Sequence, residues 1–506
     1  MKKIFTGGQI AELDRFTIKN EPIPEIELVE RAARSFVYEF NRHYMPRRND
    51  VYVFAGMGNN GADALAVSRM LLEDSYTVYT FLFNTQGKLT PECEENRMRL
   101  LETHGCHLDE VINEFNPPEM RAGSIIIDGL FGTGLNRPLE GGFAGLVQFI
   151  NESGMEVVSI DIPSGLFSEE NLGNNPKAIV HATRTFTFEY PKLAFLMSEN
   201  APFVGKWQEV SIGLSDEGKA AINASFFLAT DLDMARALEP RKTFSHKYNF
   251  GHALLVAGSR GKMGAACLSA KAALRSGLGM LTAHVPACGE VIMQISVPEA
   301  MVQIDKDESS ISGVTDPQKY SAVGVGPGLG KSSLSRTMLR ELLCSVTKPI
   351  VLDADALNII GEDRNLLDIL PPGSILTPHA RELERLTTFC DNDYDRLCQA
   401  RALAANHNIY VVLKGAYSAT CMPSGNVVFN TTGNPGMASG GSGDVLLGII
   451  TGLLAQGYPS ATAAVLGNYL HGLAGDIYAG QCSQQSLIAG DIVECIGKAY
   501  KQLTAN

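Results

Sequence analysis

The sequence lacks a surplus of basic residues, a long apolar run and a recognisable leader. Its 42 Lys and Arg stand against 55 Asp and Glu, and the net charge of −13 argues against a nucleic-acid scaffold and against a surface for anionic lipid. No stretch reaches the roughly 18 to 20 apolar residues of a membrane span, and acidic residues interrupt the amino terminus before an apolar run of signal-peptide length. We therefore expect neither nucleic acid nor a membrane as partner.

Closely spaced cysteines are also missing. The 10 cysteines are scattered from Cys93 to Cys495 without a CxxC pair, so neither a disulfide framework nor a zinc site is indicated, and a cytoplasmic location fits best. Internal repeats and low-complexity tracts are absent, and the first glycine loop has neither the GxGxxG spacing nor a Walker lysine. Any phosphate-bearing ligand must therefore be held locally, by loops and helix ends.

What the sequence does contain is apolar material for more than one core. It has 506 residues, 45% of them hydrophobic, which suggests two large domains or three smaller ones at roughly 150 residues per domain. Apolar strands alternate with helical segments in both halves, a pattern typical of βαβ units around a mostly parallel sheet. We predict an α/β protein of two domains, residues 1–215 and 240–506, joined by a polar linker at 216–239.

The stretch "GMASGGSGDVLLG", from Gly436 to Gly448, sets one acid among five glycines. Glycine amides that face one point form an anion-binding concavity, and a helix starting at Gly443 and Asp444 adds the positive end of its dipole. The acid is then either a helix cap or, beside a transferred phosphoryl group, the base that takes a hydroxyl proton. Anion hole and carboxylate together favour phosphoryl transfer.

Other loops of the second half also follow predicted strands. "VGVGPGLGKS" contains Gly328, and "VLDADALN" places Asp353 and Asp355 at the end of a strand, where they either face a ligand or cap the next helix. "TPHARELERL" offers His379 and Glu382, although a lone histidine is more often structural. "VVLKGAYSAT" ends a strand in a turn suited to backbone contact with a nucleotide.

With "GSRGKMGAA", these motifs resemble, over about residues 240 to 500, the ribokinase-like NAD(P)H-hydrate dehydratase family. The resemblance implies a ribokinase-like α/β/α domain that uses ADP with Mg²⁺ to phosphorylate the hydroxyl at C6 of a hydrated nicotinamide ring. Elimination of phosphate then restores NADH or NADPH, and AMP is released. Asp444 would be the catalytic base and a substrate contact. Further substrate contacts would be Ala265, Gly328 and His379. The nucleotide would be held by Lys414, Gly415, Ala416, Tyr417, Ser418, Ala419 and Gly443.

The first half carries three polar loops after strands. "VYVFAGMGNNGADALAVSRML" supplies Asn59, Asn60 and Asp63, "DGLFGTGLNRPLEG" has glycines that could wrap a phosphate, and "IDIPSGL" supplies Asp161 and Ser164. Loops at strand carboxyl ends converge on one crevice in a doubly wound sheet, although Asn, Gly and Asp also serve ordinary caps and turns. Carboxylate, amide and hydroxyl oxygens suit a hard cation.

These loops, within about residues 1–215, resemble the NAD(P)H-hydrate epimerase family, which implies a Rossmann-like doubly wound sheet. Asp161 would be the catalytic residue that moves a proton during inversion at C6. The hydrated cofactor would also contact Asn59, Asn60, Gly61, Ala62, Asp63, Gly132, Thr133, Gly134, Leu135, Asn136, Arg137 and Pro138. A potassium ion would be held by Asn60, Asp128 and Ser164. The family's loop reads Asn-Asn-Gly-Gly-Asp-Gly, whereas this chain has Ala62 and Ala64. A β-carbon narrows backbone approach and disfavours positive φ, so we expect these two alanines to conflict with the backbone of the family's loop.

Both halves together resemble the bifunctional NAD(P)H-hydrate repair enzymes. An epimerase would return to the dehydratase the epimer that the latter does not accept. The expected partners are small molecules, hydrated NADH or NADPH and ADP, and we expect a homo-oligomer. The alternative is a ribokinase-like kinase of a vitamin or sugar with a non-catalytic amino-terminal binding domain.

Overall fold

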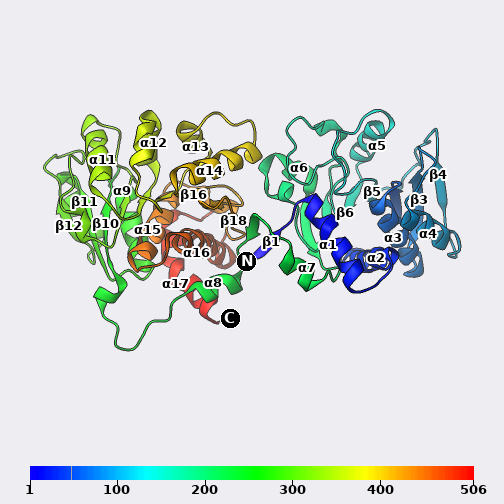
Figure 1. The fold of residues 1–506 in the computed structure, drawn as a ribbon, viewed down its shortest axis with the longest axis horizontal. Coiled ribbons are helices and arrows are strands. Elements are labelled where there is room, and N and C mark those ends of the chain that lie inside the picture. Colours follow the sequence, from blue (N-terminus) through cyan, green and yellow to red (C-terminus); the bar gives the residue numbers. More distant parts are fainter. Residues whose placement is uncertain (47, 506) are drawn as a thin grey trace. The chain divides into compact units, whose positions relative to one another are not determined.

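The structure is a computed structural model that describes residues 1–46 and 48–505. The chain forms two compact units. Residues Ile4–Ala224 form the amino-terminal unit, while Met1–Lys3 join the residues from Ser225 onward in the carboxy-terminal unit. In Figure 1, strands β2 to β6 of the amino-terminal unit are blue to cyan, and helices α9 to α17 of the carboxy-terminal unit run from green to red.

The linker predicted for residues 216–239 is instead folded. It contains α7 (Asp216–Ala221), β9 (Phe226–Leu228) and α8 (Asp231–Ala237), and the division between the units falls between Ala224 and Ser225. The apolar segment of β9 pairs in parallel with β18 (Val427–Phe429). Side chains of Ser215 and Thr230 cap the two short helices. Polar composition here reflects helix caps and exposed turns rather than a free connection.

The amino-terminal unit contains a seven-stranded sheet whose neighbouring strands all run parallel. In spatial order its strands are β4 (Leu108–Val111), β3 (Thr77–Phe83), β2 (Asp50–Ala55), β5 (Ile125–Gly129), β6 (Glu156–Ile160), β7 (Arg184–Phe188) and β8 (Lys206–Val210). The order reverses between β2 and β5, so the sheet is doubly wound with its switch point there. The predicted Rossmann-like fold is confirmed.

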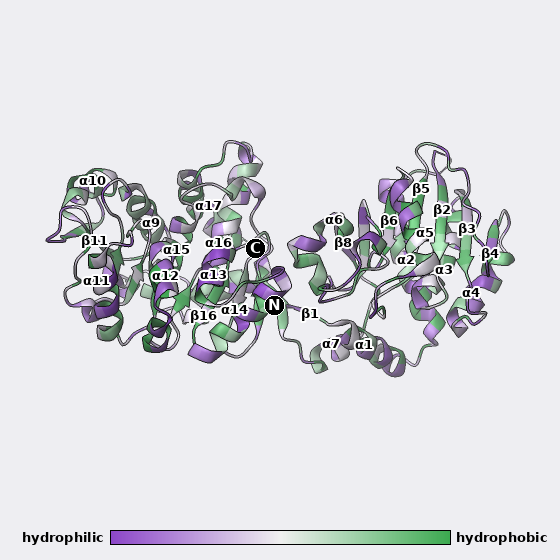
Figure 2. Cartoon of the chain, turned by 90° about the horizontal axis from the view of Figure 1, so that it is seen from above, coloured by the Kyte–Doolittle hydropathy of each residue, from purple (hydrophilic) through white to green (hydrophobic). Residues whose placement is uncertain are grey.

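Alternation along β2 explains how helices cover both faces of this sheet. Val51 and Val53 pack in one apolar cluster with α2, α3 and α4, whereas Tyr52 and Phe54 pack in another with α5. Strands buried on both faces read as continuous apolar runs, and the strands around β2 are accordingly green in Figure 2. The helices are α1 (Gly7–Asn20), α2 (Glu25–His43), α3 (Asn59–Glu73), α4 (Pro91–Leu101), α5 (Gly141–Glu152) and α6 (Ala201–Val204).

The carboxy-terminal unit contains an 11-stranded sheet. In spatial order its strands are β1 (Lys2–Ile4), β9, β18, β17 (Ala419–Cys421), β16 (Tyr410–Leu413), β15 (Ile375–Leu376), β14 (Ile350–Leu352), β13 (Ala322–Val325), β10 (His252–Val256), β11 (Met280–Val285) and β12 (Met301–Ile304). The run from β16 to β12 is parallel, and β17 is antiparallel to both of its neighbours. The remaining helices are α9 (Met263–Arg275), α10 (Glu290–Ser296), α11 (Ser333–Ser345), α12 (Ala354–Glu362), α13 (Ala380–Leu386), α14 (Asp393–His407), α15 (Ser442–Ala455), α16 (Ser460–Gln481) and α17 (Ala489–Ala505).

Helix α15 follows the glycine-rich stretch and lies in the core of this unit. Its Val445, Leu447 and Ile450 are fully buried in one cluster with residues of α9 and α16. A β-carbon on Gly448 would lie 2.3 Å from the Ser269 carbonyl oxygen, so glycine allows α15 and α9 to approach closely. Among the described residues, no helix has the length and apolarity to cross a membrane.

Candidate active sites

The carboxyl ends of β2, β5 and β6 border a cavity of about 850 Å³ in the amino-terminal unit. This position at the switch point of the sheet is where such folds bind ligands. Eight of the predicted substrate-binding residues line it: Asn59, Asn60, Asp63, Gly132, Thr133, Gly134, Leu135 and Asp161. The amino end of α3 also borders the cavity through Gly58, and no side chain caps this helix. Its free N–H groups can therefore receive an anionic ligand.

The other predicted contacts lie outside the cavity wall. Gly61 packs against the backbone of Gly56, directly after β2, because a β-carbon there would lie 1.9 Å from the Gly56 carbonyl oxygen. Ala62 is fully buried, and its N–H donates to the Gly58 carbonyl oxygen at 3.0 Å. Ala62 and Ala64 lie in α3 and are absent from the residues with positive φ. The expected backbone conflict therefore does not arise. Asn136, Arg137 and Pro138 follow the lining segment of their loop.

Asp161 forms a buried ion pair that the sequence did not reveal. Its Oδ1 accepts hydrogen bonds from Lys192 Nζ at 2.5 Å and from the Phe188 N–H at 2.9 Å. The Lys192 side chain is 1% exposed and also donates to Thr187 Oγ1 at 2.9 Å and to the Tyr190 carbonyl oxygen at 3.2 Å. Lys192 thus holds the negative charge of Asp161 in place at the wall of the cavity.

Two further carboxyl groups share this cavity with Asp161. Burial and then the charge of Asp161 raise the pKa of Asp14 to about 7, against the influence of Lys192. Burial, followed by the charges of Asp161 and Asp14, raises the pKa of Asp63 well above its usual value. Asp14 and Lys192 escaped the sequence analysis because neither stands in a glycine loop. The sequence feature that could have indicated Asp14 is its position as an acidic residue next to Leu13, a buried residue of an amphipathic helix.

The three residues predicted to bind potassium lie close together in the amino-terminal unit. Asp128 is fully buried, and its carboxylate accepts hydrogen bonds from Ser164 Oγ at 2.5 Å, the Ser164 N–H at 2.8 Å and Ser159 Oγ at 2.8 Å. Asn60 Nδ2 donates to the Phe131 carbonyl oxygen at 3.0 Å, and Ser164 Oγ lies 3.3 Å from that oxygen. Burial raises the pKa of Asp128 although its hydrogen bonds oppose this. Among the described residues no cationic side chain pairs with Asp128, and its oxygen-rich surroundings suit a hard cation.

In the carboxy-terminal unit, strand ends bring an ion pair to the start of α15. Asp353 follows β14 and is 1% exposed, and Lys414 follows β16. Lys414 Nζ lies 2.8 Å from Asp353 Oδ1 and 3.8 Å from Glu382 Oε2. A β-carbon on Gly443 would lie 3.3 Å from Lys414 Nζ and 3.4 Å from Asp353 Oδ2. The structure therefore gathers Lys414, Asp353 and Gly443 at one point.

Asp444 lies in the first turn of α15 without capping it. The N-cap is Gly441, with φ of +94°, and no side chain supplies a cap hydrogen bond. Burial and the charge of Asp353 raise the pKa of Asp444 to about 6, against the influence of Lys414. An uncapped helix end leaves N–H donors for an anion, and a carboxyl group with this pKa can take up a proton near neutral pH. The cap interpretation of Asp444 is therefore wrong.

Two side chains of helix α16 form hydrogen bonds with the glycine-rich loop. Asp476 accepts hydrogen bonds from the Gly433 N–H at 2.7 Å and from Asn434 Nδ2 at 2.8 Å. His471 Nε2 lies 2.9 Å from the Ser442 carbonyl oxygen, and burial lowers the pKa of His471 to about 4. A neutral histidine and a carboxylate thus fix both ends of the loop that precedes Asp444.

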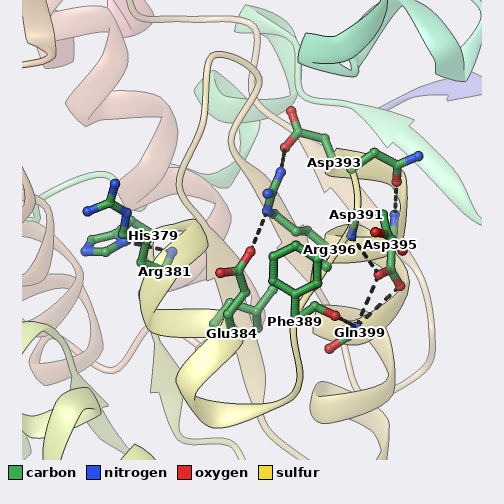
Figure 3. A network of polar contacts seen from close by, with 12 residues as sticks. His379, Arg381, Glu384, Phe389, Asp391, Asp393, Asp395, Arg396 and Gln399 are labelled. Atoms are coloured by element: carbon green, nitrogen blue, oxygen red, sulfur yellow. Dashed lines mark hydrogen bonds and ion pairs between the residues drawn. The ribbon is translucent and has the colours of Figure 1, made fainter. Parts of the chain in front are cut away.

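Asp353 and His379 cap helices as well as bordering the site. Asp353 accepts from the Ala354 N–H at 2.8 Å at the start of α12. His379 Nδ1 accepts from the Arg381 N–H at 3.1 Å at the start of α13. Burial, followed by the charge of Lys414, lowers the pKa of His379. In Figure 3, Arg396 hydrogen-bonds to Glu384 and Asp393 and so holds the segment after α13. His379 and Arg381 lie apart from this network.

The remaining predicted residues of this unit fall into two groups. A β-carbon on Gly328, whose φ is +64°, would lie 3.2 Å from the Ala265 β-carbon, so these two predicted contacts adjoin each other. Asp355 Oδ2 accepts from the Gly330 N–H at 2.8 Å and holds the same loop. Gly415 and Ser418 close a tight turn between β16 and β17, since Gly415 N–H donates to Ser418 Oγ at 3.2 Å. Ala416 and Tyr417 lie within this turn, and Ala419 begins β17.

Comparison with known proteins matches both units. A family model described as NAD(P)H-hydrate dehydratase matches residues 253–497, and one described as YjeF-related protein N-terminus matches residues 25–194. The bifunctional NAD(P)H-hydrate repair enzyme Nnr of Moorella thermoacetica is 33% identical, over 99% of this chain and 97% of its own length. The enzyme of that name from Thermofilum pendens is also 33% identical, again over 99% and 97%. A solved ribokinase-like superfamily protein from Enterococcus faecalis is 25% identical with a TM-score of 0.50, and the match covers 56% of this chain and 99% of that one.

Proposed function

The chain belongs to the family of bifunctional NAD(P)H-hydrate repair enzymes, and from that premise we propose which of its residues carry out each reaction. It is both an NAD(P)H-hydrate epimerase, an isomerase, and an NAD(P)H-hydrate dehydratase, a lyase. Full-length similarity to bifunctional relatives leaves no support for the alternative of a kinase with a non-catalytic amino-terminal domain. Repair restores NADH or NADPH from the hydrated forms.

For the dehydratase, we assign the base to Asp444. ADP, with Mg²⁺ on its phosphates, is the proposed phosphoryl donor. The uncapped amino end of α15 and its glycines would receive the transferred phosphoryl group, while Asp444 takes the proton of the C6 hydroxyl. The observation that carries this assignment is the position of Asp444, in the first turn of α15 beside the Lys414–Asp353 ion pair, where burial raises its pKa to about 6.

The nucleotide would lie along the turn from Lys414 to Ala419. The Lys414 ammonium lies beside both Asp353 and Gly443. It can therefore contact a phosphate while it stays paired with the buried carboxylate of Asp353. The Gly415 backbone is exposed and open to a ligand, since a β-carbon there would meet nothing within 4 Å. Ala265, Gly328 and His379 would contact the hydrated nicotinamide from the other strand ends.

For the epimerase, the cavity at the switch point would hold the hydrated cofactor. The free N–H groups at the amino end of α3 suit its phosphates, and Asp161 would exchange a proton with the ring substituent that inverts. A bound potassium ion would supply positive charge beside the buried Asp128. Asn60, Asp128 and Ser164 would hold it, and the contacts of Asn60 and Ser164 with the backbone of Phe131 would order the loop that follows β5.

A cytoplasmic location is also part of this proposal. The buried cysteines Cys93, Cys267, Cys390, Cys421 and Cys495 are free thiols, as expected of a protein from a reducing compartment. Assembly into a homo-oligomer stays a prediction.

The dehydratase assignment is tested with the full chain, ADP and hydrated NADH, by following recovery of the absorbance of the reduced nicotinamide. We expect the Asp444→Asn variant to lose about 10²- to 10⁴-fold in kcat, because it removes the base, while its affinity for ADP is retained. Asp216→Asn is the matched control, since Asp216 is a first-turn aspartate of α7 whose side chain is 97% exposed. Normal turnover by Asp444→Asn would refute the assignment.

A further inference from the structure

The cavity of the amino-terminal unit contains more acid than one proton-transfer residue requires. Asp14, Asp63 and Asp161 all line it, and Lys192 lines it with them. They come from four separate places: α1, the first turns of α3, the end of β6 and the segment after β7. Three carboxyl groups thus share a single buried ammonium group.

The Lys192 ammonium group pairs with one of these three carboxyl groups, that of Asp161. Lys192 Nζ lies 2.5 Å from Asp161 Oδ1 and fills its other hydrogen bonds with Thr187 and Tyr190. Among the described residues no hydrogen bond or ion pair reaches the carboxyl group of Asp14. A negative charge on Asp14 would therefore be repelled by Asp161 without a cation of its own, so the neutral acid is the favoured form.

We propose that Asp14 is a second catalytic residue of the epimerase, the general acid that acts opposite Asp161 as general base on the ring of the hydrated nicotinamide. This assignment rests on the epimerase function proposed above. It follows from the placement of an unpaired carboxyl group and a lysine-paired carboxylate in the wall of one cavity. Two carboxyl groups whose surroundings favour opposite protonation states are the usual basis of acid and base roles.

The reaction can be written as ring opening followed by closure on the other face. Asp161 takes the proton of the C6 hydroxyl, and the electron pair of that O–H bond becomes the second bond between C6 and oxygen. The C6–N1 bond breaks, its electron pair goes to N1, and Asp14 gives N1 a proton. The open form has an aldehyde at C6 and an N–H at N1.

Closure reverses each transfer after rotation about the C5–C6 bond. N1 attacks the opposite face of the aldehyde and returns its proton to Asp14, while the oxygen recovers its proton from Asp161. The configuration at C6 is then inverted, both carboxyl groups are back in their starting forms, and no co-reactant has been consumed. An enzyme that must work in both directions needs this symmetry.

The electrostatics of the cavity agree with these roles. Burial and then the charge of Asp161 raise the pKa of Asp14 to about 7, which suits a donor at neutral pH. Burial, followed by the charges of Asp161 and Asp14, also raises the pKa of Asp63 well above its usual value. The other charged residues of the wall are Arg15, Glu25 and Glu92.

The experiment uses the full chain, the separated R epimer of hydrated NADH and no nucleotide, so that dehydration is silent, and follows the S epimer by chromatography. We expect Asp14→Asn to lower kcat about 10²- to 10⁴-fold with KM within about threefold of the wild type. Glu12→Gln is the control, because Glu12 is an exposed acid of the same helix outside the cavity. We expect its rate to be unchanged.

The pH profile separates catalysis from a structural role. The wild-type rate should fall as the pH rises through about 7, because Asp14 loses the proton that it must donate, and this fall should vanish from the residual rate of Asp14→Asn. Asp14→Glu, which keeps a donor, should recover part of the rate and the fall, and it carries the test if the Asn variant does not fold.

Two results would count against different claims. If the wild type does not interconvert the epimers faster than buffer, the epimerase function itself fails. If the wild type does so but Asp14→Asn keeps its rate, loses only in KM, or keeps the alkaline fall, the general-acid role of Asp14 is overturned and the epimerase function stands.

Discussion

Replacing Ala62 and Ala64 by glycine restores the loop composition usual in the epimerase family, and we expect it to weaken the protein without speeding the reaction. Both side chains are fully buried in α3. A β-carbon built on Gly129 would lie 2.5 Å from that of Ala64, so the Ala64 methyl group packs directly on the backbone of β5.

The loss in the free energy of unfolding follows from the buried, helical surroundings of the two methyl groups. Glycine in a helix interior is about 1 kcal/mol less favourable than alanine, and a lost buried methyl group adds up to about 0.8 kcal/mol. Each substitution should therefore lower the free energy of unfolding by about 1 to 2 kcal/mol, and the pair by about 2 to 4 kcal/mol. Ala220→Gly, at an exposed position of α7, should cost only the first part.

The chain offers a probe for this measurement. Its single tryptophan is Trp207, on β8 of the amino-terminal unit. Urea unfolding followed by tryptophan fluorescence should therefore report on that unit. Epimer interconversion is measured on the same samples. A rate about tenfold above wild type in the glycine variants would refute the reasoning, because it would show that the methyl groups obstruct the substrate.

Three further outcomes are expected. Dehydratase activity should fall below about pH 6, because protonation of Asp444 removes the base, and a rate profile flat down to pH 5 would contradict this. Lys414→Met should destabilise the carboxy-terminal unit by about 3 to 5 kcal/mol in a thermal or urea titration, since it leaves the buried Asp353 unpaired. Adding Asp353→Asn should recover part of that loss. Asp128→Asn should abolish stimulation of the epimerase by KCl over a matched sodium salt, and stimulation that persists would remove Asp128 from the cation site.

The strands and the loops after them were predictable because their signals are local. Apolar runs that end in glycine, asparagine and aspartate indicated β2, β5 and β6 and the loops that now border the cavity. The start of α15 was predicted one residue from its observed position at Ser442. Such signals depend on the periodicity and turn chemistry of a few neighbouring residues.

Residues that reach a site from a distance gave no comparable signal. Asp14 joins the cavity from α1, and Lys192 reaches Asp161 from 31 positions along the chain. Their roles depend on tertiary burial, which a pattern of neighbours does not contain. The expected backbone conflict at Ala62 does not arise for a local reason, since α3 begins at Asn59 and position 62 is helical rather than part of an extended loop.

The first residues of the chain complete the sheet of the carboxy-terminal unit. β1 lies beside β9 at the edge of the 11-stranded sheet, and the Met1 amino group pairs with Asp233, 232 positions away, at 2.6 Å. In sequence terms the epimerase unit is an insertion between two neighbouring strands of the dehydratase unit. A fragment cut at Ser225 would lose its outermost strand and leave the backbone of β9 open to strands of other molecules. A dehydratase meant to stand alone should therefore keep residues 1–4, joined to Ser225 by a short turn in place of the excised unit.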